Sequence, residues 1–92
     1  MIKMNNKIII VTGGSGLLGV AFLEDLTLKG FTPINFDVSV LTDLSLGRVN
    51  CDVTNDESIK DSIDKVVSFY GRIDGLVNNA YPRTKDWGIH FE

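Results

Sequence analysis

The sequence predicts an α/β fold in which a doubly wound parallel sheet lies between two layers of helices. The run from Ile8 to Thr12 is entirely β-branched, which is typical of a strand buried on both faces. A glycine-rich turn, 13–19, follows this run directly and leads into a helix-like pattern. Strand-like and helix-like stretches then alternate along the chain. This alternation implies parallel strands joined by right-handed crossovers, and hence three layers in the order αβα.

The elements after the glycine-rich turn follow from hydrophobic spacing. An amphipathic helix is expected over 18–29, with its apolar residues at the spacing of one helix face, and Gly30 is suited to end it. A second strand is expected over 31–37 and a third over 49–53. The stretch between them, 38–48, mixes small, polar and apolar residues. It is consistent with either a short helix or a loop.

A capping box predicts the start of the second long helix. Thr54 and Glu57 have the spacing at which each side chain accepts from the other's backbone N–H. Apolar residues then recur at helical spacing up to Gly71. A fourth strand is expected over 73–78, and 79–92 is loop-like. The expected strand order is 3-2-1-4, the first half of a Rossmann-type nucleotide-binding fold and therefore an incomplete one.

Length, charge and cysteine content limit the possible classes of protein. Residues 1–92 fit one small domain. The net charge of -3 and the lack of a basic run argue against nucleic acid or an anionic membrane as a partner. No apolar segment is long enough to span a bilayer. The single cysteine, Cys51, excludes an internal disulfide and any cysteine-cluster metal site, so a cytoplasmic location is expected.

The glycine-rich turn has the chemistry of an anion site. A helix start leaves backbone N–H groups without partners and carries a partial positive charge. Gly13, Gly16 and Gly19 have the spacing GxxGxxG between a strand and a helix, which is the context in which such a motif binds a diphosphate. The alternative is an ordinary glycine-rich turn between a strand and a helix.

Asp37 ends the second strand, beside the glycine-rich turn in the expected sheet. A carboxylate at this position can accept hydrogen bonds from both hydroxyls of an adenosine ribose. It would repel a 2′-phosphate, and no lysine or arginine directly follows Asp37, so NAD is expected and NADP is disfavoured. The alternative is a solvated loop aspartate.

Four stretches together match a known family in order and spacing. They are 12–19 (TGGSGLLG), Asp37 at the end of the second strand, 51–54 (CDVT) and 76–80 (LVNNA). In these stretches the chain resembles the short-chain dehydrogenases/reductases. The resemblance implies hydride transfer between a nicotinamide and an alcohol or carbonyl, with a homo-oligomeric full-length enzyme. It also implies that Asp52 and Val53 contact the adenine, and that Asn79 and Ala80 lie beside the adenosine and ribose. The expected cofactor-binding residues are Gly13, Ser15, Gly16, Leu17, Leu18, Asp37, Asp52, Val53, Asn79 and Ala80.

The chain departs from the family pattern at two positions. Leu17 stands where the commonest members have glycine, so the spacing is that of the extended members. Tyr81 replaces the usual glycine after Asn-Asn-Ala, and Pro82 favours an extended backbone at Tyr81. The ring would either narrow the nicotinamide end of the site or point outward. The string 78–83 (NNAYPR) resembles a subgroup linked to flagellin modification and surface-sugar synthesis, which favours a nucleotide-sugar substrate.

The family's catalytic residues have no counterpart among these 92 residues. The family uses a serine on the fifth strand and a Tyr-x-x-x-Lys pair, whose lysine lowers the tyrosine pKa. Tyr70 is followed by Asp74 at that spacing, and Lys85 follows Tyr81 in a loop that contains proline. His90 lacks partners for a metal site. The chain is therefore expected to be the inactive cofactor half of an enzyme; a non-catalytic dinucleotide-binding module and a methyltransferase fragment are the alternatives.

Overall fold

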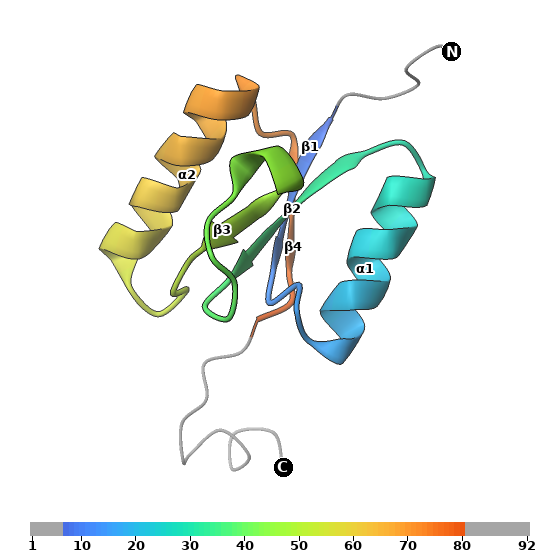
Figure 1. Ribbon diagram of the computed structural model, residues 1–92, viewed down its shortest axis with the longest axis horizontal. Coiled ribbons are helices and arrows are strands. Elements are labelled where there is room, and N and C mark those ends of the chain that lie inside the picture. Colours follow the sequence, from blue (N-terminus) through green and yellow to red (C-terminus); the bar gives the residue numbers. More distant parts are fainter. Residues whose placement is uncertain (1–6, 81–92) are drawn as a thin grey trace.

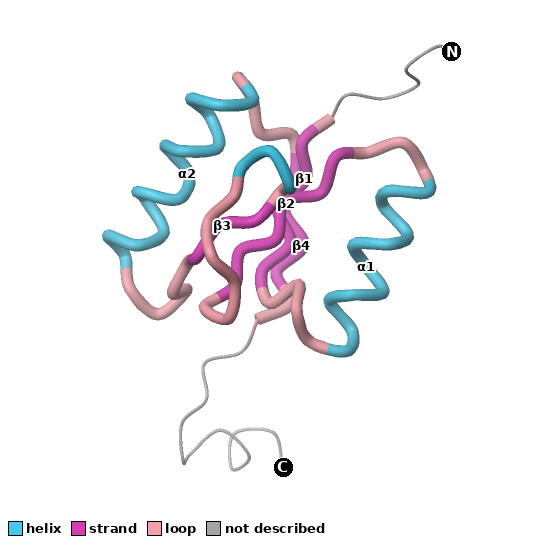
Figure 2. Tube along the Cα trace, viewed as in Figure 1, coloured by secondary structure: helices cyan, strands magenta, loops and turns pink. Residues whose placement is uncertain are grey.

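The computed structural model describes residues 7–80. Tyr81, Pro82, Lys85 and His90 lie outside the described residues, and so do the expectations attached to them. The elements, shown in Figures 1 and 2, are β1 (Ile8–Thr12), α1 (Leu17–Leu28), β2 (Thr32–Asp37), η1 (Leu44–Leu46), β3 (Arg48–Asn50), α2 (Asp56–Tyr70) and β4 (Gly75–Asn78).

The four strands form one parallel sheet in the order β3-β2-β1-β4, which confirms the predicted topology. Ile10 is in register with Ile34 on one side and with Leu76 on the other. Figure 1 shows α1 and α2 on opposite sides of the sheet, so the molecule has the three expected layers. The order reverses between β1 and β4. The carboxyl ends of these two strands therefore lie next to each other at one end of the sheet.

The main core lies between the sheet and α2. Alternate residues of β1 and β2 point toward this side, and Val66 of α2 packs against them with no exposed surface. The buried residues of this cluster are Ile8, Ile10, Ile34, Phe36, Val49, Cys51 and Val66. Burial of branched side chains on both faces of β1, including Val11 on the other face, explains why its sequence is apolar without alternation.

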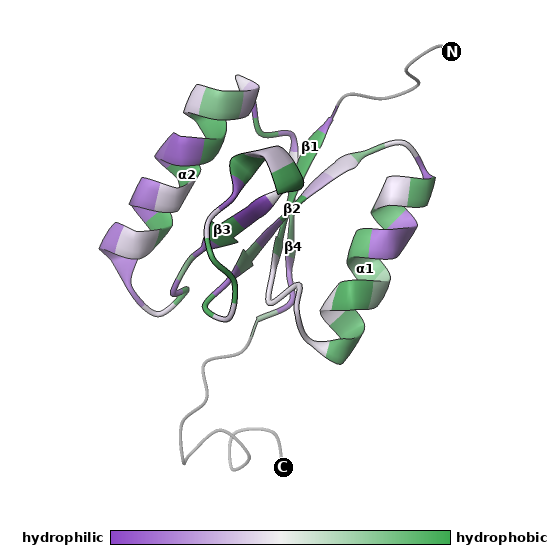
Figure 3. Ribbon diagram, in the orientation of Figure 1, coloured by the Kyte–Doolittle hydropathy of each residue, from purple (hydrophilic) through white to green (hydrophobic). Residues whose placement is uncertain are grey.

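Helix α1 is less amphipathic than the spacing of its apolar residues predicts. Leu18, expected on the sheet-facing side, is 57% exposed, and Leu17 is 95% exposed. Figure 3 shows hydrophobic residues around much of α1, whereas α2 has hydrophilic residues along its visible side. Phe22, Leu23 and Leu26 are half-buried. The prediction that this helix is amphipathic was therefore wrong.

The predicted capping box of α2 was also wrong by one residue. The N-cap is Asn55, whose side chain accepts a hydrogen bond from the Ser58 backbone N–H. The Thr54 hydroxyl instead donates to the Asp52 carboxylate at 2.6 Å. This bond turns the Thr54 side chain toward Asp52, and Asn55 is the residue with extended backbone that directly precedes the helix.

The observed strand limits differ from the predicted ones for reasons visible in the hydrogen bonds. β3 ends at Asn50 because the Asp52 N–H donates to the Ser58 hydroxyl rather than to β2. The stretch 38–48 contains the short helix η1, capped by the Asp43 side chain. Gly30 follows α1 with a φ of 90°, one residue beyond the helix C-cap at Lys29. In the described part of the chain, neither helix has the length and apolar character needed to cross a membrane.

Candidate functional site

A cleft of about 700 Å³ opens at the carboxyl ends of the strands. All ten residues that the sequence predicts for cofactor binding line this one cleft: Gly13, Ser15, Gly16, Leu17, Leu18, Asp37, Asp52, Val53, Asn79 and Ala80. Phe36, Val38, Ser39, Cys51 and Thr54 complete its lining. None of these fifteen residues is a lysine or arginine. The fold therefore brings together residues from four separate stretches of the chain.

The turn between β1 and α1 is shaped by its glycines. Gly13 has a φ of 69°, which favours glycine, and its N–H donates to the Phe36 carbonyl at 2.8 Å. A Cβ added to Gly19 would lie 2.2 Å from the Gly13 carbonyl oxygen, which is far inside contact distance. The first turn of α1 can therefore pack directly on the preceding loop only because position 19 has no side chain.

The N-terminus of α1 has no cap from a side chain. Gly16 is the N-cap residue, and the first turn has no acidic side chain. The N–H groups of Leu17 and Leu18, which line the cleft, have no acceptor within the helix. At α2, by contrast, Asn55 caps the helix and Asp56 lies in its first turn. The start of α1 thus presents free donors and a partial positive charge at the cleft.

The Asp37 carboxylate lies at the end of β2, bonded to the glycine-rich turn. One oxygen, Oδ2, accepts from the Ser15 N–H at 3.0 Å. The other, Oδ1, accepts from the Ser39 N–H at 2.9 Å and from the Ser39 hydroxyl at 2.8 Å. Partial burial raises the pKa of Asp37, but the hydrogen bonds from Ser39 and Ser15 outweigh this and leave the pKa below its ordinary value. The carboxylate is therefore ionised at neutral pH and held in one orientation.

Thr12 connects the end of β1 to the end of β4. Its Oγ1 accepts from the N–H groups of Asn79 and Ala80, at 2.9 and 3.0 Å, and donates to Asn78 Oδ1 at 3.1 Å. The Asn79 Nδ2 donates to the Gly13 carbonyl at 3.1 Å. Figure 1 shows the resulting arrangement, in which the end of β4 lies beside the loop that precedes α1. The Asn79 amide nitrogen therefore supports the turn.

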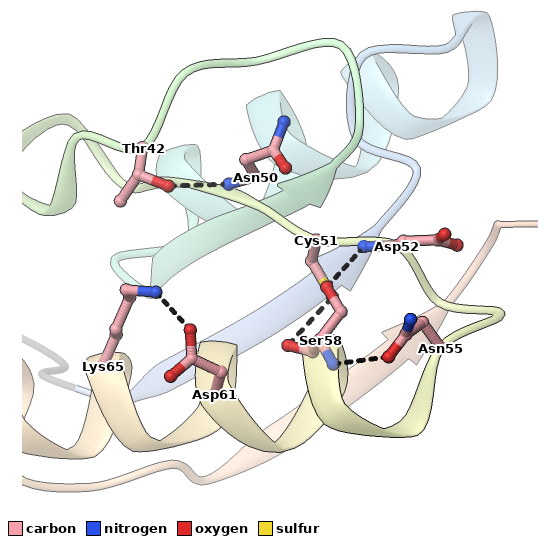
Figure 4. A network of polar contacts seen from close by, with 8 residues as sticks. All are labelled: Thr42, Asn50, Cys51, Asp52, Asn55, Ser58, Asp61 and Lys65. Carbon is pink, nitrogen blue, oxygen red and sulfur yellow. Dashed lines mark hydrogen bonds and ion pairs between the residues drawn. The ribbon is translucent and has the colours of Figure 1, made fainter.

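Asp52 and Val53 form the wall of the cleft that follows β3. The Thr54 hydroxyl and N–H both donate to Asp52 Oδ1, and these bonds lower the pKa of Asp52. Figure 4 shows the Asp52 N–H bonded to Ser58, which in turn is bonded to Asn55. This chain of contacts ties the wall of the cleft to the start of α2.

Two residues near the cleft were missed by the sequence reasoning. Ser39 donates twice to Asp37, and its position two residues after a carboxylate is the spacing of an Asx turn, which could have revealed it. Asn35 donates to the Ser15 hydroxyl at 3.1 Å. No local pattern predicts this contact because the two residues are 20 positions apart.

Comparison with known proteins decides the family. The family profile described as short chain dehydrogenase matches residues 7–85. The chain belongs to the short-chain dehydrogenase family. This confirms the predicted resemblance.

Individual relatives support the same family. The chain is 31% identical over 97 residues to the post-translational flagellin modification protein A of Campylobacter coli, covering 92% of this chain and 38% of that protein. It is 34% identical over 98 residues to the human NAD(+) 15-hydroxyprostaglandin dehydrogenase, covering 91% and 37%. The ligand-free Thermoplasma acidophilum aldohexose dehydrogenase superposes with a TM-score of 0.76 and 35% identity, covering 87% and 31%. The chain thus spans less than two fifths of the length of these relatives.

Proposed function

We propose that this chain is the NAD-binding portion of a short-chain oxidoreductase that transfers hydride between a nicotinamide and an alcohol or carbonyl. The observation that carries the proposal is the position of Asp37. Its ionised carboxylate is hydrogen-bonded to the Ser15 N–H, so it lies directly beside the uncapped start of α1. An anion site and a diol acceptor at the edge of one cleft match the two polar parts of an adenosine diphosphate.

Each part of the dinucleotide has residues suited to hold it. The free N–H groups at the start of α1 suit the diphosphate, and Asp37 suits the adenosine ribose hydroxyls. Asp52 and Val53 line the part of the cleft assigned to the adenine, and Asn79 and Ala80, which line the same cleft, are assigned to the adenosine and ribose. When bound, the nicotinamide supplies the hydride acceptor or donor, and this chain positions it.

The charge at the cleft supports NAD rather than NADP. A 2′-phosphate would have to approach the ionised Asp37, and none of the residues that line the cleft is a lysine or arginine to offset the repulsion. The related 15-hydroxyprostaglandin dehydrogenase carries NAD(+) in its name. We propose the same cofactor preference here.

The substrate proposal rests on two relatives. The names of the Campylobacter coli protein and of the Thermoplasma acidophilum enzyme refer to flagellin modification and to an aldohexose. We therefore propose a sugar or nucleotide sugar as the alcohol or carbonyl substrate. Catalysis would require a serine and a Tyr-x-x-x-Lys pair supplied by sequence outside these residues, in a cytoplasmic homo-oligomer. By itself, the 92-residue chain is expected to bind cofactor without turning it over.

Fluorescence titration with NADH and NADPH tests the cofactor proposal. The wild-type chain should bind NADH more tightly than NADPH. Asp37→Asn should weaken NADH binding about 10-fold or more, since hydrogen bonds to a charged group contribute about 1.5–3 kcal/mol, and it should reduce the preference for NADH. Asp64→Asn, which removes a carboxylate from the exposed side of α2, is the matched control. Equal affinity of wild type and Asp37→Asn for NADH would disprove the assignment of the ribose site.

A further inference from the structure

Asn35 is a buried polar residue in the middle of β2. Its side chain is on the α1 side of the sheet and only 7% of the residue is exposed. The Nδ2 donates to the Ser15 hydroxyl at 3.1 Å. The Oδ1 is fully buried and has no hydrogen-bond partner within residues 7–80. A buried polar atom without a partner destabilises a folded chain, so the amide at this position calls for a reason other than stability.

The glycine-rich turn is fitted closely over the Asn35 amide. A Cβ added to Gly14 would lie 2.3 Å from Asn35 Oδ1 and 2.6 Å from Asn35 Cγ. The Asn35 amide thus fills the space that a side chain at position 14 would need. The amide fits there because residue 14 is a glycine. This close contact fixes the amide under the turn, where it can reach Ser15.

The bond from Asn35 determines what the Ser15 hydroxyl can do. A serine hydroxyl has one proton to donate and two lone pairs to accept with. Because Ser15 Oγ accepts from Asn35 Nδ2 on the buried side, its own proton must point to another acceptor. Ser15 is exposed and lines the cleft beside Asp37 and Gly16, and the Asp37 carboxylate is the acceptor that its hydroxyl meets on this side.

We propose that Asn35 is a positioning residue for cofactor binding: its buried amide commits the Ser15 hydroxyl to act as a donor into the cleft, to the Asp37 carboxylate in the structure described and to the diphosphate when the dinucleotide is bound. This inference rests on the proposed function, because it takes the cleft to be the NAD site. It extends that function because Asn35 does not line the cleft, yet it controls the hydroxyl group of Ser15, which does. The unpaired Oδ1 is then the stability cost of placing the donor Nδ2 against Ser15.

The test uses Asn35→Val, which removes the amide and suits a buried strand position. NADH binding should weaken about 5-fold, because the Ser15 hydroxyl is then free to rotate away from the diphosphate. Thermal stability should stay equal or rise, since the unpaired buried oxygen is removed together with its hydrogen bond. A merely structural amide would instead lower the melting temperature and leave the affinity of the folded protein unchanged.

A double-mutant cycle with Ser15→Ala separates positioning from other effects. Ser15→Ala alone should weaken NADH binding about 5- to 10-fold, and adding Asn35→Val should cause no further loss. Equal losses from Asn35→Val in both backgrounds would overturn the proposal. If wild type binds NADH and Asp37→Asn does not, but Asn35→Val binds like wild type, only the role of Asn35 fails. If wild type does not bind NADH, the proposed function fails as well.

Discussion

Gly19→Ala perturbs the contact between α1 and the glycine-rich turn by a single methyl group. The added Cβ would lie 2.2 Å from the Gly13 carbonyl oxygen, 2.7 Å from Gly14 Cα and 2.9 Å from Gly13 C. All three atoms belong to the backbone, so no side-chain rotation relieves the overlap. The start of α1 would have to move away from the turn by about 1 Å to restore ordinary contact distances.

The expected cost follows from two opposing effects. Overpacking of this kind costs about 1–3 kcal/mol, and the upper end applies here because only backbone can yield. Alanine within a helix gains about 1 kcal/mol over glycine. The net loss is then about 2 kcal/mol. For a small domain, whose urea dependence is about 1 kcal/mol per molar, this lowers the unfolding midpoint by about 2 M.

Urea unfolding followed by circular dichroism measures this difference. Gly16→Ala is the matched control, because its Cβ would lie 3.5 Å from the Gly13 carbonyl oxygen, an ordinary contact. The control should lose about 1 kcal/mol at most, since Gly16 is the N-cap of α1 and alanine is less favourable than glycine at that position. If Gly19→Ala unfolds at the same urea concentration as wild type, the close packing of α1 on the turn is refuted.

Three further predictions concern the cap, the strand connection and pH. Asn55→Ala should lower the free energy of unfolding by about 1 kcal/mol, whereas Glu57→Ala should change it little. The opposite ranking would support the capping box predicted from the sequence. Thr12→Val should cost about 2 kcal/mol because the Asn79 N–H loses its acceptor, whereas Thr12→Ser should retain stability; equal unfolding midpoints for the two variants would contradict this. Partial burial raises the pKa of Asp37, but the hydrogen bonds lower it further, so its ionised form persists until the pH falls below the ordinary value of 3.8. Any stability that Asp37 contributes is therefore present above that value and is lost as the pH falls through the folded-state pKa. NAD binding should be constant from pH 7 to 5. An Asp37-dependent loss of binding within that range would contradict the assignment of Asp37 to the ribose.

The sequence was sufficient to predict the sheet and ten of the fifteen residues that line the cleft. The apolar run of β1 requires burial on both faces, and this places it at the centre of a parallel sheet. Once β1 is central, a strand order that reverses beside it brings the glycine-rich turn and the end of β4 to one edge. The ten predicted cofactor residues line a single cleft for this topological reason.

The details that sequence reasoning missed depend on competition between neighbouring groups. Thr54 and Asn55 are both good N-cap residues, and the choice depends on Asp52, which takes the Thr54 hydroxyl. The contact of Asn35 with Ser15 depends on how closely the turn packs over β2, which spacing along the chain does not encode.

The exposed leucines of α1 show a further limit of pattern reading. Leu17 and Leu18 lie at the helix start, where the chain lines the cleft rather than the sheet. Helical periodicity assigns residues to a face, but it does not show where along the helix that face stops meeting the sheet. Apolar side chains at the mouth of a cleft are suited to cover a ligand, which is a use that periodicity alone does not reveal.

Amide chemical-shift mapping of the full 92-residue chain during titration with NAD tests the central claim most directly. We expect the largest changes at the backbone amides of 13–18 and 37–39, with smaller changes at Asp52 and Val53. The outer side of α2 should remain unchanged and serves as an internal reference. Changes confined to α2, or none at millimolar NAD on a folded chain, would contradict the dinucleotide site.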